Sequence, residues 1–127
     1  MGKHEVKKET KKRFTAKLLF QFRVLVAGDS GKRRLCEERI VLISAPNAQK
    51  ALSEVKKKGR AAQFKYKNNE GWYVHFEFVG VLELLCLDPG CDADEVWYKI
   101  CERILPMENR RKLIPSEAKL SAIRNKE

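Results

Sequence analysis

The chain has 127 residues and a net charge of +10, with 27 lysines and arginines against 17 aspartates and glutamates. Hydrophobic residues make up 43% of the sequence and charged residues 35%, a balance that excludes a wholly disordered chain and is typical of one packed domain. No apolar run approaches the roughly 20 residues of a membrane span, and no apolar segment follows the charged amino terminus, so we expect a soluble cytoplasmic protein.

The amino-terminal part predicts a tail followed by a strand. Residues 1–12 alternate lysine with glutamate and lack apolar periodicity, which favours a flexible basic tail. From Phe14 to Val26, apolar side chains occupy every second position, as in a strand with one buried face. We expect a single α+β domain over residues 13–105 and a C-terminal extension over residues 106–127 that is ordered only in part.

The stretch from Gly28 to Lys32 resembles a phosphate-binding loop in its two glycines and its lysine. Such a loop needs four residues between its glycines and a serine or threonine after its lysine, because backbone N–H groups must surround the phosphate and a hydroxyl must reach magnesium. Here two residues separate the glycines, and Arg33 follows the lysine. Residues 35–45 are rich in Ile, Val and Leu and predict a second strand, so the loop is interpreted as a hairpin turn.

A helix is predicted after this second strand. Pro46 and Asn47 are start signals, and the apolar residues that follow recur at helical spacing through Val55. Lysines 56–58 fall in the last turn, where positive charge complements the helix dipole, and Gly59 is expected to end the helix in the left-handed conformation.

Residues 63–87 form two alternating runs around a turn at residues 68–71, which predicts a second hairpin. The even positions carry its apolar side chains, from Phe64 to Leu82 and Leu84. Gly80 occupies an even position, and the alternation continues in the same phase after it. We therefore expect a bend or a close backbone approach at Gly80 and no change of strand register.

The segment after residue 90 has two readings. As a helix, Asp92 would cap it and an apolar stripe would run to Pro106; as a strand, Val96, Tyr98 and Ile100 would alternate with polar positions. The complete order predicts an α+β fold: an antiparallel sheet of four to five strands, with one main helix packed on one face, in the order β-β-α-β-β-β.

Six stretches carry a resemblance to a known family: AKLLFQFRVLV, RRLCEERIVLISA, YKNNEG, FEFVGVLEL, DEVWY and LPMENRRKLIP. Over about residues 14–117 the chain resembles a family of small, mostly bacterial proteins known as a domain of unknown function, of the DUF4288 type. The resemblance implies that residues 95–104 are a final strand. It implies no activity, cofactor or catalytic residue.

Metal and catalytic sites are weakly indicated. The four cysteines lack paired Cys-x-x-Cys spacing, and a zinc site would have to join Cys86 and Cys91 to Cys101 or His75, so free thiols and no metal or cofactor are expected. His75 and Glu77 share one strand face with Tyr73, where they could form a small polar site or an ordinary solvated surface. We name no catalytic residue and favour a protein that is not an enzyme.

Positive charge is the strongest functional signal. If the cationic side chains gather on one surface, they predict binding to nucleic acid or another polyanion, and no base-reading motif indicates sequence specificity. The candidate contacts are Lys7, Lys8, Lys11, Lys12, Arg13, Lys32, Arg33, Arg34, Lys56, Lys57, Lys58, Arg60, Lys65 and Lys67.

The alternative is a protein-interaction module of the adaptor, inhibitor or immunity type. Trp97 and Tyr98 are residue types favoured as interface anchors, and a sheet of four or five strands leaves edges that can pair with a partner or in a homodimer. No membrane partner is expected.

Overall fold

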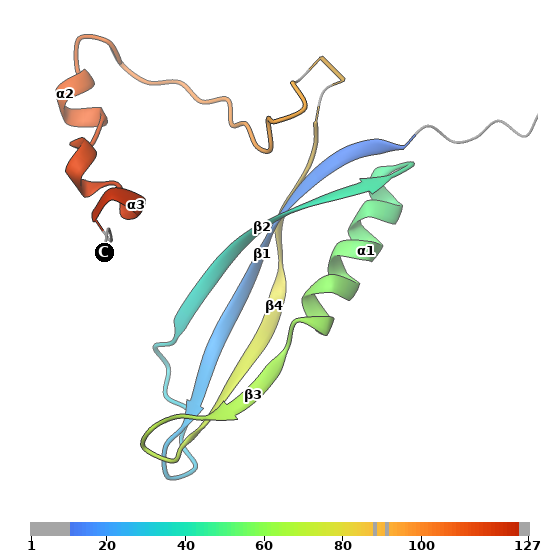
Figure 1. Cartoon of the computed structure of the whole chain (residues 1–127), viewed down its shortest axis with the longest axis vertical. Coiled ribbons are helices and arrows are strands. Elements are labelled where there is room, and N and C mark those ends of the chain that lie inside the picture. Colours follow the sequence, from blue (N-terminus) through green and yellow to red (C-terminus); the bar gives the residue numbers. More distant parts are fainter. Residues whose placement is uncertain (1–10, 88, 91, 125–127) are drawn as a thin grey trace, which may run out of the picture.

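A computed structural model describes residues 11–87, 89–90 and 92–124. Four strands form one antiparallel sheet in the spatial order β2-β1-β4-β3. They are β1 (Lys12–Leu25), β2 (Leu35–Ala45), β3 (Phe64–Lys67) and β4 (Tyr73–Cys86), and helix α1 (Ala48–Ala61) joins β2 to β3 (Figure 1). The α+β class and the main helix on one face are confirmed. In the described part of the chain, no helix is long and apolar enough to cross a membrane.

The predicted fifth strand is wrong. Residues 95–103 belong to neither a strand nor a helix, and three short helical segments follow within the described residues: α2 (Arg110–Leu113), η1 (Glu117–Lys119) and α3 (Ser121–Arg124). The alternation of apolar side chains favours an extended backbone, but a strand also needs a partner for its N–H and C=O groups. In the described structure no strand pairs with residues 95–103, the Glu95 N–H donates to the Asp92 carbonyl oxygen within a turn, and the sheet has four strands.

The first hairpin prediction is confirmed. Val26 and Asp29 exchange two backbone hydrogen bonds of 3.0 Å around Ala27 and Gly28, whose φ angles are 52° and 83°. Two successive positive φ angles define the turn type whose twist suits a hairpin. The strand β2 follows, as expected, and pairs with β1 over Phe22 to Lys12.

Helix α1 begins where its cap predicts and ends later than expected. The Asn47 side chain accepts a hydrogen bond of 2.9 Å from the backbone N–H of Lys50. Gly59 lies inside the helix, which continues to Ala61. The C-cap residue is Ala62, and its backbone has an ordinary right-handed conformation. A Cβ atom at Gly59 would lie 2.5 Å from a ring carbon of Phe78, so this glycine lets the helix touch β4.

The close contact at Gly59 predicts that Gly59→Ala lowers the free energy of unfolding by about 1 to 2 kcal/mol. The added methyl group would clash with the Phe78 ring, and this destabilisation exceeds the stabilisation from the higher helix propensity of alanine. Urea denaturation followed by circular dichroism measures this change. Gly80→Ala is the matched control, since nothing lies within 4 Å of the Cβ atom it would add. Equal stability of the two variants would contradict the close approach.

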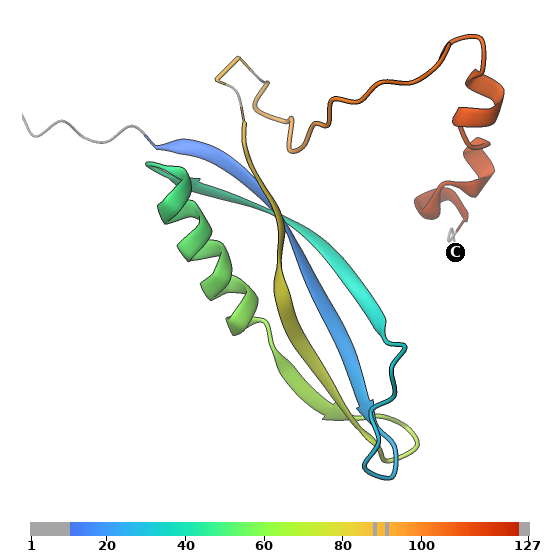
Figure 2. The same cartoon turned by 180° about the vertical axis from the view of Figure 1, so that it is seen from behind.

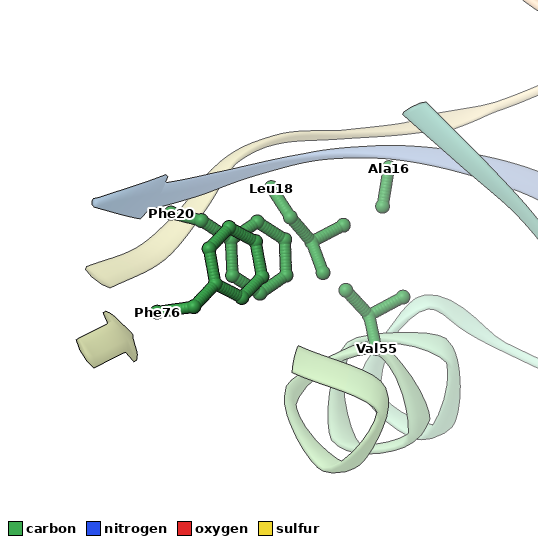
Figure 3. Close-up of a cluster of buried hydrophobic side chains, with 5 residues drawn as sticks. All are labelled: Ala16, Leu18, Phe20, Val55 and Phe76. Carbon is green, nitrogen blue, oxygen red and sulfur yellow. The ribbon is translucent and has the colours of Figure 1, made fainter. Parts of the chain in front are cut away.

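The core lies between α1 and one face of the sheet. Figure 3 shows Ala16, Leu18 and Phe20 of β1 with Val55 of α1 and Phe76 of β4, all at most 2% exposed. The Phe20 and Phe76 rings stack with their centroids 4.7 Å apart. Because these side chains of β1 face α1, the alternate residues of β1 point to the opposite face, which α1 leaves open.

Strand β4 changes register twice beside β1, so the expectation of constant phase is wrong. Val79 and Leu82 have no partner in β1, and Gly80 pairs with Leu19 between them. These bulges turn Val81 onto the core and leave Leu82 51% exposed. The close backbone approach considered for Gly80 occurs at Gly59 instead.

Candidate functional site

The face of the sheet opposite α1 carries a row of polar side chains near the hairpin turns. The register places Lys65 of β3 beside His75 of β4, and His75 beside Arg23 of β1. One step nearer the turns, Lys67 lies beside Tyr73. In both views the two hairpin connections lie together at the same end of the sheet (Figures 1 and 2).

A hydrogen-bonded network fixes the middle of this face. The Arg23 guanidinium donates to both carboxylate oxygens of Glu77, at 2.8 and 2.9 Å, and the Gln21 amide donates to one of them at 3.0 Å. The carbonyl oxygen of that amide accepts from Arg34 at 3.1 Å. The Glu77 carboxylate and the Gln21 amide therefore fix the side chains of Arg23 and Arg34 on the surface of the sheet.

The network makes Glu77 a poor general base. Hydrogen bonding from Arg23, opposed in part by desolvation, lowers the pKa of Glu77 from 4.5 to about 2, with further help from Gln21 and the Arg23 charge. A carboxylate with this pKa binds protons weakly at neutral pH. The polar cluster that we considered around His75 and Glu77 thus contains an ion pair, and its chemistry suits a structural role.

Acid is expected to remove this contribution to stability. Because the folded pKa of Glu77 lies below its ordinary value, the contribution is present above pH 4.5 and is lost as the pH falls from 4.5 to about 2. Glu77→Gln should therefore be less stable than the parent protein near neutral pH, and the difference should shrink over this window. Urea midpoints measured from pH 6 to pH 2 test this, with Glu70→Gln in the exposed turn as control. A constant difference would contradict it.

Two lysines flank an exposed tyrosine beside this network. The Nζ atoms of Lys65 and Lys67 each lie 5.1 Å from the centre of the Tyr73 ring, which is 44% exposed. Neither lysine forms an ion pair with a carboxylate in the described residues. We call Arg23, Arg34, Lys65 and Lys67 the basic patch; within the described residues, Glu77 is the one carboxylate paired with it, through Arg23.

The other candidate cations do not converge on this patch. Lys7 and Lys8 lie outside the described residues. Lys11, Lys12 and Arg13 are at the opposite end of β1, where the Arg13 guanidinium donates to the carbonyl oxygens of Asp92 and Ala93. Lys56, Lys57, Lys58 and Arg60 belong to α1, on the other side of the sheet. The structure thus divides the expected single surface into three regions.

Lys32 and Arg33 are in the β1–β2 connection, at the same end as the basic patch. Arg33 lines a cavity of about 360 Å³ with Phe22, Val24 and Tyr66, on the α1 side of the sheet beyond the end of the helix. These two cations therefore border the patch and extend positive charge around the hairpin end.

Trp97 and Tyr98 lie near the far end of the open face. The Lys17 ammonium is 5.4 Å from the centre of the Trp97 ring, and the side chain of Tyr98 is 41% exposed. Together with Glu83 and Leu85 they line a cavity of about 440 Å³ between the extended segment and the sheet.

No group of three or more His, Cys, Asp or Glu side chains in the described part of the chain could hold a metal ion. Cys36, Cys86 and Cys101 are free and exposed. Cys91, which the zinc alternative required, lies outside the described residues.

Arg23 was not among the candidate site residues predicted from the sequence, and Tyr73 was named only as a neighbour of His75 and Glu77 on their strand face. The turn at residues 68–71 would have placed Tyr73 opposite Lys67 and His75 opposite Lys65, so this part of the site was accessible from the sequence. The pairing of Arg23 with Glu77 depends on the register of β1 against β4, which no turn between them sets.

A family described as "Domain of unknown function (DUF4288)" matches residues 13–97. The chain belongs to this family. The match contains all the strands of the sheet, α1 and the basic patch, and it confirms the resemblance found in the sequence, although it ends before residues 98–117, which the resemblance had included. No curated protein and no solved structure matches the chain. Membership of DUF4288 assigns no activity, so the function rests on the site.

Proposed function

We propose that this protein is a non-catalytic binding module that contacts nucleic acid, or another polyanion, through the basic patch and without sequence specificity. One observation carries the proposal: Lys65 and Lys67 flank an exposed tyrosine ring and have no carboxylate partner in the described structure. Lysines in this state can exchange their counterions for phosphate groups of a ligand.

The arrangement favours a single strand over a duplex. Tyr73 is 44% exposed on an open strand surface, where an unstacked base can lie against its ring by displacing the Lys65 and Lys67 ammonium groups toward the phosphates of the backbone. Stacking on one aromatic ring accepts any base, which agrees with the absence of a base-reading motif. The bidentate contact with Glu77 fixes the Arg23 guanidinium on the same face of the sheet while leaving the patch positive overall.

Binding titrations test the proposal. We expect a fluorescently labelled single-stranded oligonucleotide of mixed sequence to bind, with a logarithmic salt slope of about −2 to −4 if three to five phosphates are contacted. A duplex of the same length should bind more weakly. Absence of binding at low salt, or an affinity that does not change with salt, would contradict the proposal.

The second candidate is a protein-interaction module, and the edge of the sheet favours it. Among the described residues, no strand lies on the outer side of β2, and its Ile40 and Leu42 side chains are 48% and 47% exposed. Long apolar edges are where further strands pair. This candidate and the polyanion proposal use different parts of the sheet.

A cytoplasmic location is part of the proposal. Three exposed free thiols are compatible with a reducing compartment, where disulfides rarely form.

A further inference from the structure

The C-terminal segment exposes an unusual amount of apolar surface. Figures 1 and 2 show it leaving the end of β4 and running away from the sheet, and α2, η1 and α3 make no packing contact with the sheet or with α1. Ile100 and Ile104 are 89% and 85% exposed. Ten large apolar side chains of residues 96–123 are exposed in all: Val96, Tyr98, Ile100, Ile104, Leu105, Met107, Leu113, Ile114, Leu120 and Ile123. Exposed apolar surface on this scale marks a contact with another molecule.

The root of this segment is held on its own sheet. Arg13 donates hydrogen bonds of 2.9 and 3.1 Å to the carbonyl oxygens of Ala93 and Asp92, and Lys17 lies against the Trp97 ring. Tyr98, Lys99 and Ile100 still line a cavity with side chains of the sheet, and the chain then leaves it. We call residues 96–124 the arm; because its first residues are held on the sheet, the remainder projects from the domain in a defined place.

The same chain carries an edge that the arm could fill. Residues 96–101 keep a strand pattern, with Val96, Tyr98 and Ile100 alternating with polar positions or Trp97, yet they pair with no strand in the described structure. The outer side of β2 has backbone N–H and C=O groups along 11 residues and no neighbouring strand. The two features are complementary in backbone chemistry, since each lacks a ladder of hydrogen bonds.

We propose that residues 96–104 of one copy pair with the outer edge of β2 in a second copy, and that the two copies exchange arms reciprocally. A second copy fits because the arm extends away from its own sheet, while each chain supplies both an arm and an open β2 edge. In a dimer with twofold symmetry, each arm then pairs with the β2 edge of the other copy, and both arms are buried in a single interface.

Apolar surface agrees with this exchange. The large apolar side chains Leu35, Ile40 and Leu42 of β2 are 47 to 74% exposed, while Glu37 and Glu38 already pair with Arg39 and Lys17. Each arm exposes ten large apolar side chains, and a standard interface buries about 1,600 Å² in total. The arm lies almost wholly beyond the residues that match the family, so arm exchange would be a property of this chain and not of the matched domain.

Light scattering during size-exclusion chromatography of the full chain tests the exchange. We expect twice the monomer mass of 14.7 kDa at micromolar concentration. The double variant Ile100→Asp and Ile104→Asp should be monomeric, with the dissociation constant raised at least about tenfold. Its circular dichroism spectrum should match that of the parent protein, because both side chains are exposed in the single chain, while its unfolding midpoint should fall to that of the monomer. The matched control, Ser116→Asp with Ala118→Asp, adds the same charge to exposed arm positions without removing a large apolar side chain and should remain a dimer.

Hydrogen–deuterium exchange locates the contact. The amides of residues 35–45 should exchange more slowly in the parent protein than in the Ile100→Asp and Ile104→Asp variant. A monomeric parent protein, a variant that still dimerises, or slowed exchange that spares β2 would each overturn the proposal. The basic patch is intact in every variant, so oligonucleotide binding by a monomer would leave the proposed function standing while the exchange failed.

Discussion

Replacing Lys65 and Lys67 together by glutamate is expected to weaken binding of a single-stranded oligonucleotide by about 10- to 100-fold at low salt, because two phosphate contacts are lost and two repulsive charges are added. The expected loss shrinks as salt rises, since screening reduces both terms. Both side chains lie on the exposed strand β3, so the variant should fold like the parent protein. Fluorescence anisotropy with one labelled oligonucleotide at two salt concentrations measures the change.

The control moves the same charge change to the other side of the sheet. Lys56 and Lys58 are exposed on α1, and their replacement by glutamate alters the net charge equally. This control should lower the affinity far less than the change at Lys65 and Lys67. Equal losses in the two variants would mean that net charge, and not the basic patch, governs binding.

Replacing Phe76 by alanine is expected to lower the free energy of unfolding by about 3 to 5 kcal/mol, the range found for deleting a buried phenylalanine. Phe76 is 2% exposed, and its ring contacts the rings of Phe20, Phe22 and Phe64 with centroid distances of 4.7 to 5.0 Å. The loss would take a large share of the roughly 5 to 15 kcal/mol that stabilises a domain. Urea denaturation followed by circular dichroism measures it.

Phe64→Ala is the matched control for this change. The same ring is removed from β3, but Phe64 is 54% exposed, so much of its surface is already in water. Its loss should cost clearly less than the loss of Phe76. Comparable costs would show that the stacked rings of Phe20 and Phe76 are not the centre of the core.

Local signals in the sequence were enough for the hairpins and the helix. The Gly28 turn and the turn at residues 68–71 need particular backbone angles that few residue types supply, and Asn47 supplies a cap that acts within one helical turn. Each of these features depends on residues close together in the chain. Their order then gave the α+β class.

Features set by distant contacts were not accessible in this way. Gly59 follows a lysine run, as a helix-ending glycine does, but its place is determined by the ring of Phe78 on another element. The bulges of β4 depend on how β1 curves across it. Residues 95–103 have the alternation of a strand, and alternation cannot tell whether a neighbouring edge is present.

The candidate site was predictable in part for the same reason. Lys65 and Lys67 were identified from their alternation along β3; strand pairing places Tyr73 beside Lys67, and Arg23 and Lys65 on either side of His75. The expected gathering of all cations failed, because α1 places Lys56 to Arg60 on the opposite side of the sheet.

The most direct test of the polyanion proposal is a nuclear magnetic resonance titration of the ¹⁵N-labelled full chain with an unlabelled single-stranded oligonucleotide. We expect the amide shifts to move along β3, at Tyr73 and His75 of β4, and around Arg23 of β1, while α1 stays unchanged. Shifts confined to α1 or to residues 96–124, or no shifts at low salt, would contradict binding through the basic patch.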